Sequence, residues 1–270
     1  MTVKTGNRLL LLILPILLGL VYVVETIMPQ VTLTRLRSPR LEAFFGDHRV
    51  VQISDLHLVK FGIRERLTIS ALERISPDII FMTGDHLEPY TEIAELEKFL
   101  SRLTAIAPVV ATTGNNDYCC LDSLVQVMKR VGSVFLRNES VLLVNGADSL
   151  YLVGLEDNFL QYDDYFKAAE NVPGGAARIV LGHVPAVAET FDPAGVEVVL
   201  AGHLHGGQIF LPFYGPAAKT GDCSYATAMY TAGLYTVQGR PLYSNRGIGT
   251  SIVPVRFLSR PEVAVLEFVK

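Results

Sequence analysis

Cysteine is scarce in this sequence, and basic residues are not in excess. The 270 residues include three cysteines, and two of them, Cys119 and Cys120, are adjacent. Adjacent cysteines rarely reach the geometry of a disulfide, so we expect no disulfide-stapled fold. The 23 Lys and Arg residues are outnumbered by 27 Asp and Glu residues, which gives a net charge of −4. Because nucleic-acid binding usually requires a clustered surplus of Lys and Arg, we expect no nucleic acid among the partners.

A long uncharged run lies near the N-terminus. It extends from Leu9 to Val24 and, when continued to Met28, reaches the roughly 20 residues that cross a bilayer. A cleaved signal peptide would end in a small-x-small site, and none follows Leu20. We therefore predict one transmembrane anchor over residues 1–30 and one domain over residues 31–270. Basic residues flank the run on both sides, so the positive-inside rule does not fix its orientation.

Beyond the anchor, two kinds of segment alternate. Residues 49–54, 78–83 and 108–113 are short, β-branched and apolar, as is typical of strands buried on both faces. Residues 64–75 and 92–103 place apolar side chains at three- and four-residue intervals, which predicts amphipathic helices. This alternation predicts an α/β fold with parallel strands.

Polar residues follow each apolar strand-like run. Two further runs, over residues 177–181 and 196–201, also end in histidines. Ligands in open α/β sheets bind beyond the carboxyl ends of the strands, so we expect these side chains to converge. The candidate ligands are Asp55, His57, Asp85, Asn115, His183, His203 and His205.

Imidazole, carboxylate and amide groups together suit first-row divalent metals, and the absence of thiolates is atypical of a structural zinc cage. Seven ligands exceed one ordinary site. Two ions bridged by one carboxylate, for which Asp85 is the natural candidate, form the binuclear clamp used on phosphate esters.

Each motif alone is weak evidence, because a single buried histidine is more often a hydrogen-bonded core residue than a ligand. Joint placement changes this balance, since four of the six histidines follow strand-like runs. His48 precedes its strand, so we interpret it as a surface residue. His86 adjoins the proposed bridge and remains a candidate.

The motifs DLH, GDH, GNND, GHVP and GHLHGGQ, in this order, resemble those of the calcineurin-like metallophosphoesterases. The segments GGQIFLPFYGP and YTAGLYTVQGRPLYSNRGIGTSIVPVRFLSRPE resemble the membrane-associated bacterial branch of that superfamily, which includes phosphodiesterases and UDP-2,3-diacylglucosamine hydrolases of lipid A synthesis. The resemblance implies two packed mixed β-sheets flanked by helices, a four-layer sandwich. It also implies a single-pass protein of the bacterial inner membrane that acts on a phosphate ester.

The resemblance further implies two divalent ions, with Mn favoured and Fe or Zn as alternatives. Asp55, His57, Asp85 and His205 would hold the first ion. The second would be held by Asp85, Asn115, His183 and His203. Gly206 and Gly207 would then leave room for the substrate.

One position departs from the family, in which a histidine follows the asparagine ligand. Here that position is Asn116, whose amide donates a hydrogen bond but supplies no proton. Three explanations compete: a substrate with a good leaving group such as a nucleotide diphosphate, replacement of the missing imidazole by His86, or loss of efficient catalysis. Asn116 and His86 are thus the candidate catalytic residues.

Substrate binding has one candidate residue, Arg246, which stands among glycines in SNRGIGT. A structural turn is an equal alternative there. Two hypotheses follow for the whole protein. The first is an anchored binuclear phosphodiesterase or pyrophosphatase, and the second is a metal-binding membrane scaffold with weak or lost catalysis.

Overall fold

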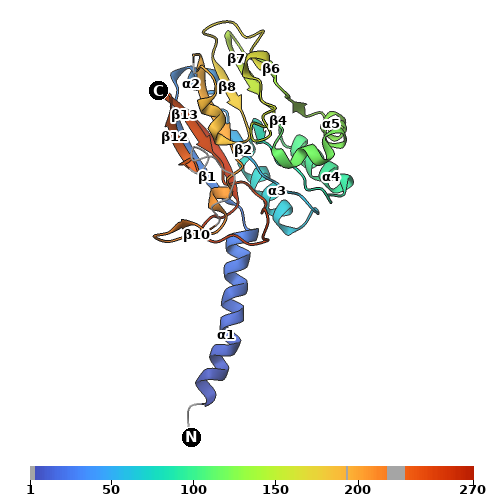
Figure 1. Ribbon diagram of the computed structural model, residues 1–270, viewed down its shortest axis with the longest axis vertical. Coiled ribbons are helices and arrows are strands. Elements are labelled where there is room, and N and C mark those ends of the chain that lie inside the picture. The colour runs from blue at the N-terminus through green and yellow to red at the C-terminus, as the bar shows by residue number, and fades with distance from the viewer. Residues whose placement is uncertain (1–3, 193, 218–228) are drawn as a thin grey trace.

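The computed structural model describes the backbone of residues 4–192, 194–217 and 229–270, and their side chains from Ile13 onward. Two six-stranded sheets form the body of the molecule (Figure 1). The first has the strand order β1-β14-β2-β3-β4-β5, and the second has the order β12-β13-β9-β8-β7-β6. Both sheets are mixed, because β14 is antiparallel to β2 while β6 and β12 are antiparallel to their neighbours.

The strands and helices have the following bounds. The strands of the first sheet are β1 Gln30–Arg37, β2 Val50–Ile53, β3 Ile79–Thr83, β4 Val109–Thr112, β5 Val134–Phe135 and β14 Glu262–Val269. Those of the second are β6 Glu139–Asn145, β7 Asp148–Gly154, β8 Arg178–Leu181, β9 Val196–Ala201, β12 Gly233–Val237 and β13 Arg240–Ser244. A short hairpin pairs β10 Phe210–Leu211 with β11 Gly215–Pro216. The α-helices are α1 Lys4–Tyr22, α2 Pro39–Phe45, α3 Ile63–Ile75, α4 Ile93–Thr104, α5 Leu121–Arg130 and α6 Tyr165–Ala168.

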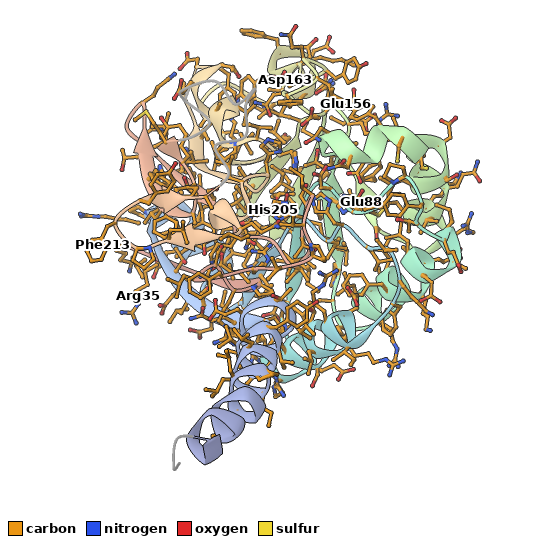
Figure 2. The ribbon with its side chains drawn as sticks, turned by 60° about the horizontal axis from the view of Figure 1, so that its bottom comes forward. Arg35, Glu88, Glu156, Asp163, His205 and Phe213 are labelled. Carbon is orange, nitrogen blue, oxygen red and sulfur yellow. The ribbon has the colours of Figure 1, made fainter. Side chains whose placement is uncertain are left out.

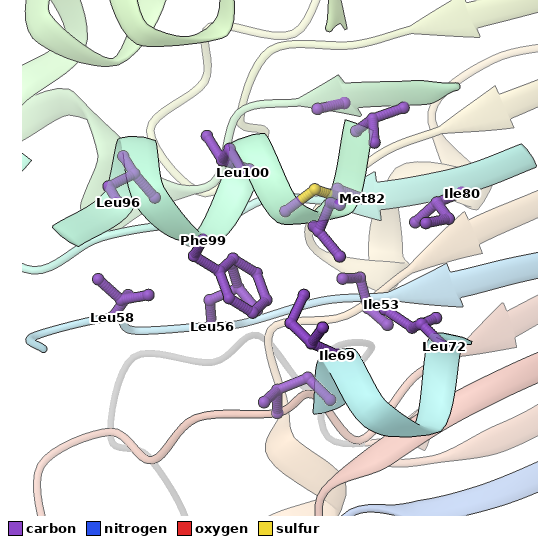
Figure 3. Packing of buried hydrophobic residues seen from close by; sticks show 14 of the residues in the cluster. Ile53, Leu56, Leu58, Ile69, Leu72, Ile80, Met82, Leu96, Phe99 and Leu100 are labelled. Carbon is purple, nitrogen blue, oxygen red and sulfur yellow. The ribbon is translucent and has the colours of Figure 1, made fainter. Parts of the chain in front are cut away.

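Three apolar cores separate four layers. The first lies between helices α3 to α5 and the first sheet, where Phe99 and Leu100 of α4 pack near Ile80 and Met82 of β3 (Figure 3). The second lies between the sheets and contains Phe81, the residue between Ile80 and Met82. Successive strand residues therefore face two different cores, which explains why β3 is apolar along its whole length. The third core covers the outer face of the second sheet.

The predicted strands and helices up to residue 113 are confirmed to within one residue at each end. The two mixed sheets flanked by helices are confirmed as well. The structure adds that the five polar strand ends do not belong to one sheet: β2, β3 and β4 lie in the first sheet, and β8 and β9 lie in the second. The ends converge because the two sheets pack face to face.

The prediction of a membrane-spanning helix is not supported. Within the described ranges, no helix is both long enough and apolar enough to cross a bilayer. Helix α1 ends at Tyr22 and passes into a π-helical turn, Val23–Ile27, which is bound to the body. There the Glu25 carboxylate accepts a hydrogen bond from the Leu258 amide at 2.7 Å, and the buried Thr26 hydroxyl accepts one from the Arg256 amide at 3.0 Å.

Candidate metal centre

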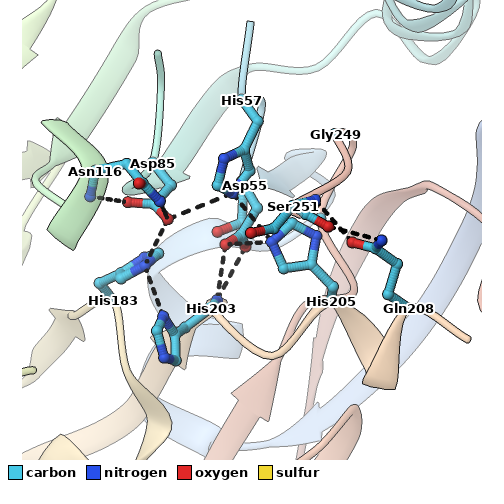
Figure 4. Close-up of polar contacts among 12 residues, drawn as sticks. Asp55, His57, Asp85, Asn116, His183, His203, His205, Gln208, Gly249 and Ser251 are labelled. Atoms are coloured by element: carbon cyan, nitrogen blue, oxygen red, sulfur yellow. Dashed lines mark hydrogen bonds and ion pairs between the residues drawn. The ribbon is translucent and has the colours of Figure 1, made fainter. Parts of the chain in front are cut away.

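The sheets bring six of the seven predicted ligands to one point (Figure 4). Asp55, Asp85 and Asn115 follow β2, β3 and β4 of the first sheet, whereas His183 and His203 follow β8 and β9 of the second. Two groups of donor atoms result, each with its atoms within 4.8 Å of one another. We call them the first ligand group, Asp55, His57 and His205, and the second ligand group, Asp85, His183 and His203.

The backbone at these residues is unusual. The φ angles of Asp55, His57, Asp85, His203 and His205 lie between 41° and 69°, in the left-handed region that side-chain-bearing residues rarely adopt. Such strain persists only where the surrounding structure enforces it, and it clusters at functional sites. Five of the seven predicted ligands therefore share a strained conformation at the place where their donor atoms come together.

The separations between donor atoms match those of ligands around one ion. Two ligands about 2.1 Å from a metal, at angles between octahedral and tetrahedral values, lie about 3.0–3.4 Å apart. In the first ligand group, His205 Nε2 lies 3.0 Å from His57 Nε2 and 3.5 Å from Asp55 Oδ1. In the second, His183 Nε2 lies 3.2 Å from His203 Nδ1 and 3.3 Å from Asp85 Oδ2.

Asp85 connects the two groups. The same oxygen, Oδ2, that lies 3.3 Å from His183 Nε2 also lies 3.4 Å from His57 Nε2 of the first ligand group. One carboxylate oxygen within reach of both sets of donors is the arrangement expected of a bridging ligand.

Hydrogen bonds from the far side of two rings fix which nitrogen is free. His57 Nδ1 donates to the Glu88 carboxylate at 2.6 Å, and His183 Nδ1 donates to the Thr83 carbonyl at 2.7 Å. When such a ring is neutral, as it must be to bind a metal, it presents an unprotonated Nε2 to the cluster. Glu88, a residue that our sequence analysis missed, thus orients His57.

Asn115 has an unfilled acceptor and stands between Gly114 and Asn116, which both lie against Asp85. Its side-chain oxygen is buried and has no hydrogen-bond partner among the described residues. A buried polar atom without a partner is rare and costs stability, unless a group outside the chain satisfies it. A metal ion would do so, because amide oxygens coordinate divalent cations. The donor separations, the free ring nitrogens and this oxygen all fit a pair of divalent ions.

The charges of the second ligand group depend on one another. Burial lowers the pKa of His183, but the charge of Asp85 and its hydrogen bond outweigh this effect and raise the pKa well above its ordinary value. Burial raises the pKa of Asp85, yet the charge of His183 outweighs it and holds the pKa well below the usual range. Burial and the charge of His183 together lower the pKa of His203 to about 3. Asp85 is therefore held as a carboxylate, the form that binds a cation.

Asn116 contacts the bridge. Its backbone N–H donates to Asp85 Oδ1 at 2.8 Å, and its side-chain amide donates to Asp85 Oδ2 at 2.7 Å. The residue therefore holds the Asp85 carboxylate in place.

His86 lies outside the cluster. Its side chain is buried, Nε2 donates to the Thr112 carbonyl at 2.8 Å, and the ring packs against Phe135. Although His86 adjoins Asp85 in sequence, the structure does not bring its imidazole to the ligand groups, so replacement of the missing histidine by His86 has no geometric support.

The guanidinium of Arg246 also points elsewhere. It lies 3.3 Å from Glu262 Oε1 and 3.2 Å from Gln30 Oε1. Gly206 and Gly207 do not open space, because a Cβ at Gly206 would meet the side chains of Ser259 and Arg246, and one at Gly207 would lie 2.9 Å from Pro216 Cβ. Both glycines have positive φ and allow close packing rather than substrate entry.

Arg256 is the largest contribution to the site that our sequence analysis missed. Its side chain is almost fully buried, with 1% exposed, and its Nη2 lies 3.1 Å from His205 Nδ1. It also donates to the carbonyls of Gly249, Ser259 and Arg246 at 2.8 to 2.9 Å. A lone basic residue within the apolar stretch IVPVRFL was the available signal.

A second missed residue follows β7. Asp157 is fully buried, and its Oδ1 has no hydrogen-bond partner in the described chain. Burial raises its pKa, while the nearby charge of His183 lowers it. Two residues on, the Phe159 ring packs 5.6 Å from that of His203. Polar residues after the apolar run LYLVGL were the available signal.

Comparisons with known proteins agree with this geometry. The family model described as calcineurin-like phosphoesterase matches residues 48–207, a range that contains all seven predicted ligands. The "Uncharacterized metallophosphoesterase YkuE" of Bacillus subtilis is 30% identical over 250 residues, which cover 89% of this chain and 86% of that protein. "Phosphodiesterase YaeI" of Escherichia coli is 30% identical over 84% of this chain and 86% of its own length.

A third relative has a more specific name. "UDP-2,3-diacylglucosamine pyrophosphatase LpxG" of Chlamydia muridarum is 27% identical over 296 residues, which cover 87% of this chain and 88% of that protein.

Proposed function

Because the chain belongs to the calcineurin-like phosphoesterase family and is a metal-dependent phosphoester hydrolase, we propose that it uses two metal ions to cleave a phosphodiester or pyrophosphate bond. The observation that carries this proposal is the position of Asp85 Oδ2, 3.4 Å from His57 Nε2 and 3.3 Å from His183 Nε2. We assign the seven ligands as the resemblance implies, with Asp85 as the bridge and Asn115 beside the second ligand group.

Bound ions would lower the pKa of a coordinated water and polarise the phosphoryl oxygens. Mn²⁺ suits this mixture of imidazole, carboxylate and amide donors, with Fe and Zn as alternatives.

The residues of the chain position these groups. Glu88 and the Thr83 carbonyl orient two imidazoles, and Asn116 fixes the bridging carboxylate. With its amide committed to Asp85, Asn116 supplies no proton to a departing alkoxide. A leaving group that departs as a phosphate monoester needs little protonation, so the site favours a pyrophosphate bond or another bond with a good leaving group.

We further propose that the substrate is UDP-2,3-diacylglucosamine, which the relative from Chlamydia hydrolyses according to its name. Cleavage of its pyrophosphate bond would release UMP, a leaving group of the kind that the site favours. The protein would then act at the inner membrane of a bacterium, held there by the exposed apolar side chains of α1, such as Ile16, Leu18 and Leu20.

The test is release of UMP from UDP-2,3-diacylglucosamine by the full-length protein in detergent with Mn²⁺. His203→Ala serves as the control because it removes one donor of the second ligand group. Metal-dependent release that the variant loses supports the proposal.

Two other outcomes separate the alternatives. Metal-dependent hydrolysis of bis(4-nitrophenyl) phosphate without UMP release would retain the phosphoesterase and reject this substrate. Metal binding without turnover of either compound would favour a scaffold with lost catalysis.

A further inference from the structure

We propose that an apolar ledge beside the metal centre seats the catalytic body on a lipid bilayer. The ledge consists of Phe210, Leu211, Phe213 and Tyr214 of the β10–β11 hairpin, with Ile252 and Val253 of the loop before Arg256. The proposal deepens the proposed function, because a surface of this kind would bring the site to a substrate that resides in the membrane.

The exposure of these side chains is large. Phe213 is fully exposed, and Ile252 is 90% exposed. Figure 2 shows Phe213 at the outer edge of the molecule, directed away from the body. Scattered apolar residues are ordinary on protein surfaces, but a contiguous patch usually marks an interaction site. Aromatic and branched aliphatic side chains that protrude are also those that enter the interfacial region of a bilayer.

The two segments form one unit. The Phe210 amide donates to the Phe257 carbonyl, and the Phe257 amide donates to the Gln208 carbonyl, both at 2.9 Å. The Gln208 side chain donates to the carbonyls of Ser251 and Val253 and accepts from the Ser251 amide. Hairpin and loop are therefore held together by hydrogen bonds, and we expect them to contact a partner as one surface.

The ledge adjoins the place where α1 leaves the body, and this favours a bilayer over other partners. The loop reaches the base of α1 through the Leu258 amide, which donates to Glu25. In Figure 1 the hairpin projects sideways at the end of the body from which α1 extends. The described part of α1 exposes apolar side chains along its length, among them Ile16 at 70%. The apolar helix and the apolar loop tips lie at the same end of the molecule, and the tips project sideways from the helix axis. One bilayer could therefore receive the helix and contact the tips at its surface.

The ledge is also continuous with the metal centre. Gln208, which holds hairpin and loop together, follows the candidate ligand His205 by three residues, and Arg256 contacts His205 from the other segment. Contact with a bilayer through the ledge would therefore place the ligand groups near the lipid headgroups.

The sequence contains no tryptophan, so one substitution provides a local probe. Full-length Phe213→Trp would be reconstituted in phosphatidylcholine–phosphatidylglycerol vesicles, and its fluorescence measured with brominated lipids and with iodide. The matched control is Phe166→Trp. Phe166 is 78% exposed and lies on α6, which packs against the outer face of the second sheet and is not part of the ledge. Ile252→Trp is a second probe of the ledge, should the first variant fold poorly.

We expect brominated lipid to quench the ledge probes at least threefold more than the control, and iodide to quench the control more. Strong quenching of the ledge probes by iodide would overturn the proposal. So would protection from both quenchers, because a second copy of the chain would then cover the ledge. The readout needs no turnover. Failure of UMP release with lipid quenching intact would therefore reject the proposed substrate and leave the bilayer contact standing.

Discussion

Replacement of Arg256 by methionine tests the link between the apolar segment after β13 and the metal centre. The guanidinium makes three short hydrogen bonds to carbonyls, those of Gly249 and Arg246 at 2.8 Å and that of Ser259 at 2.9 Å. A buried acceptor that loses its donor costs about 1–3 kcal/mol. Because methionine is also far easier to bury than a guanidinium, we take the lower end for each carbonyl and expect a loss of about 3 kcal/mol.

For a chain of this size, each kcal/mol lowers Tm by about 2–4 °C, so we expect Arg256→Met to unfold about 6–12 °C below the wild type in calorimetry. The variant also frees His205 Nδ1 from its contact at 3.1 Å. A guanidinium only donates hydrogen bonds, so this contact favours the tautomer in which His205 Nε2, the nitrogen that faces the other ligands, carries the proton. Arg256→Met should therefore bind Mn²⁺ at least as tightly as the wild type, which titration calorimetry would measure.

The control is Arg35→Met, which removes an exposed ion pair between Arg35 of β1 and Glu267 of β14. Such pairs add little stability, so its Tm and its Mn²⁺ affinity should match those of the wild type. If Arg256→Met also retained the wild-type Tm, or bound Mn²⁺ more weakly, Arg256 would not act as we describe.

Four further predictions concern the cluster itself. His86→Phe should lower the unfolding free energy by about 1–3 kcal/mol, because a buried hydrogen bond is lost. It should leave kcat within about twofold of the wild type. A complete loss of turnover would instead show that the His86 imidazole takes part in the reaction. Asn116→Ala should weaken Mn²⁺ binding about 10- to 100-fold in calorimetry, since Asp85 Oδ2 loses its donor, and an unchanged Kd would argue against that role. Gly114→Ala should abolish binding at the bridge, because its Cβ would overlap Asp85 Oδ1; full metal occupancy by elemental analysis would refute this. Because the pKa of His183 is raised, the metal-free ring carries a proton near neutral pH, which a metal must displace. The Kd for Mn²⁺ should therefore rise as the pH falls from 8 to 6. A Kd that does not depend on pH would contradict that protonation state.

The sequence was most informative for strands in which every side chain is buried. Strands β2, β3 and β4 are buried on both faces, so their apolar runs were recognisable without any knowledge of the partner sheet. The same runs could not show that β8 and β9 belong to a second sheet, because sheet membership depends on long-range pairing rather than on local pattern.

Six of the candidate ligands could be predicted to lie together, because metal sites restrict residue type and because these residues follow strands of the two sheets. Residues that form a hydrogen bond to the far ring nitrogen of a histidine ligand are not restricted to a few residue types. Glu88 and Arg256 are common residue types whose roles depend on hydrogen bonds to His57 and His205. For His86 the error has a local cause: adjacent residues at a turn point in different directions, so closeness to Asp85 in sequence did not mean closeness to the metal ligands.

The N-terminal prediction lacks support for a related reason. Hydropathy treated residues 9–28 as one segment, but Glu25 and Thr26 form hydrogen bonds with the loop around Arg256 and Leu258. A run of apolar composition does not show where a helix ends and contact with the body begins.

The central claim is that one carboxylate, Asp85, joins two metal sites. The most direct test is the number of Mn²⁺ ions bound per chain at saturation, measured by equilibrium dialysis for the wild type and for Asp85→Asn. The account predicts two ions for the wild type and at most one for the variant. One ion or none in the wild type, or two retained by Asp85→Asn, would contradict it.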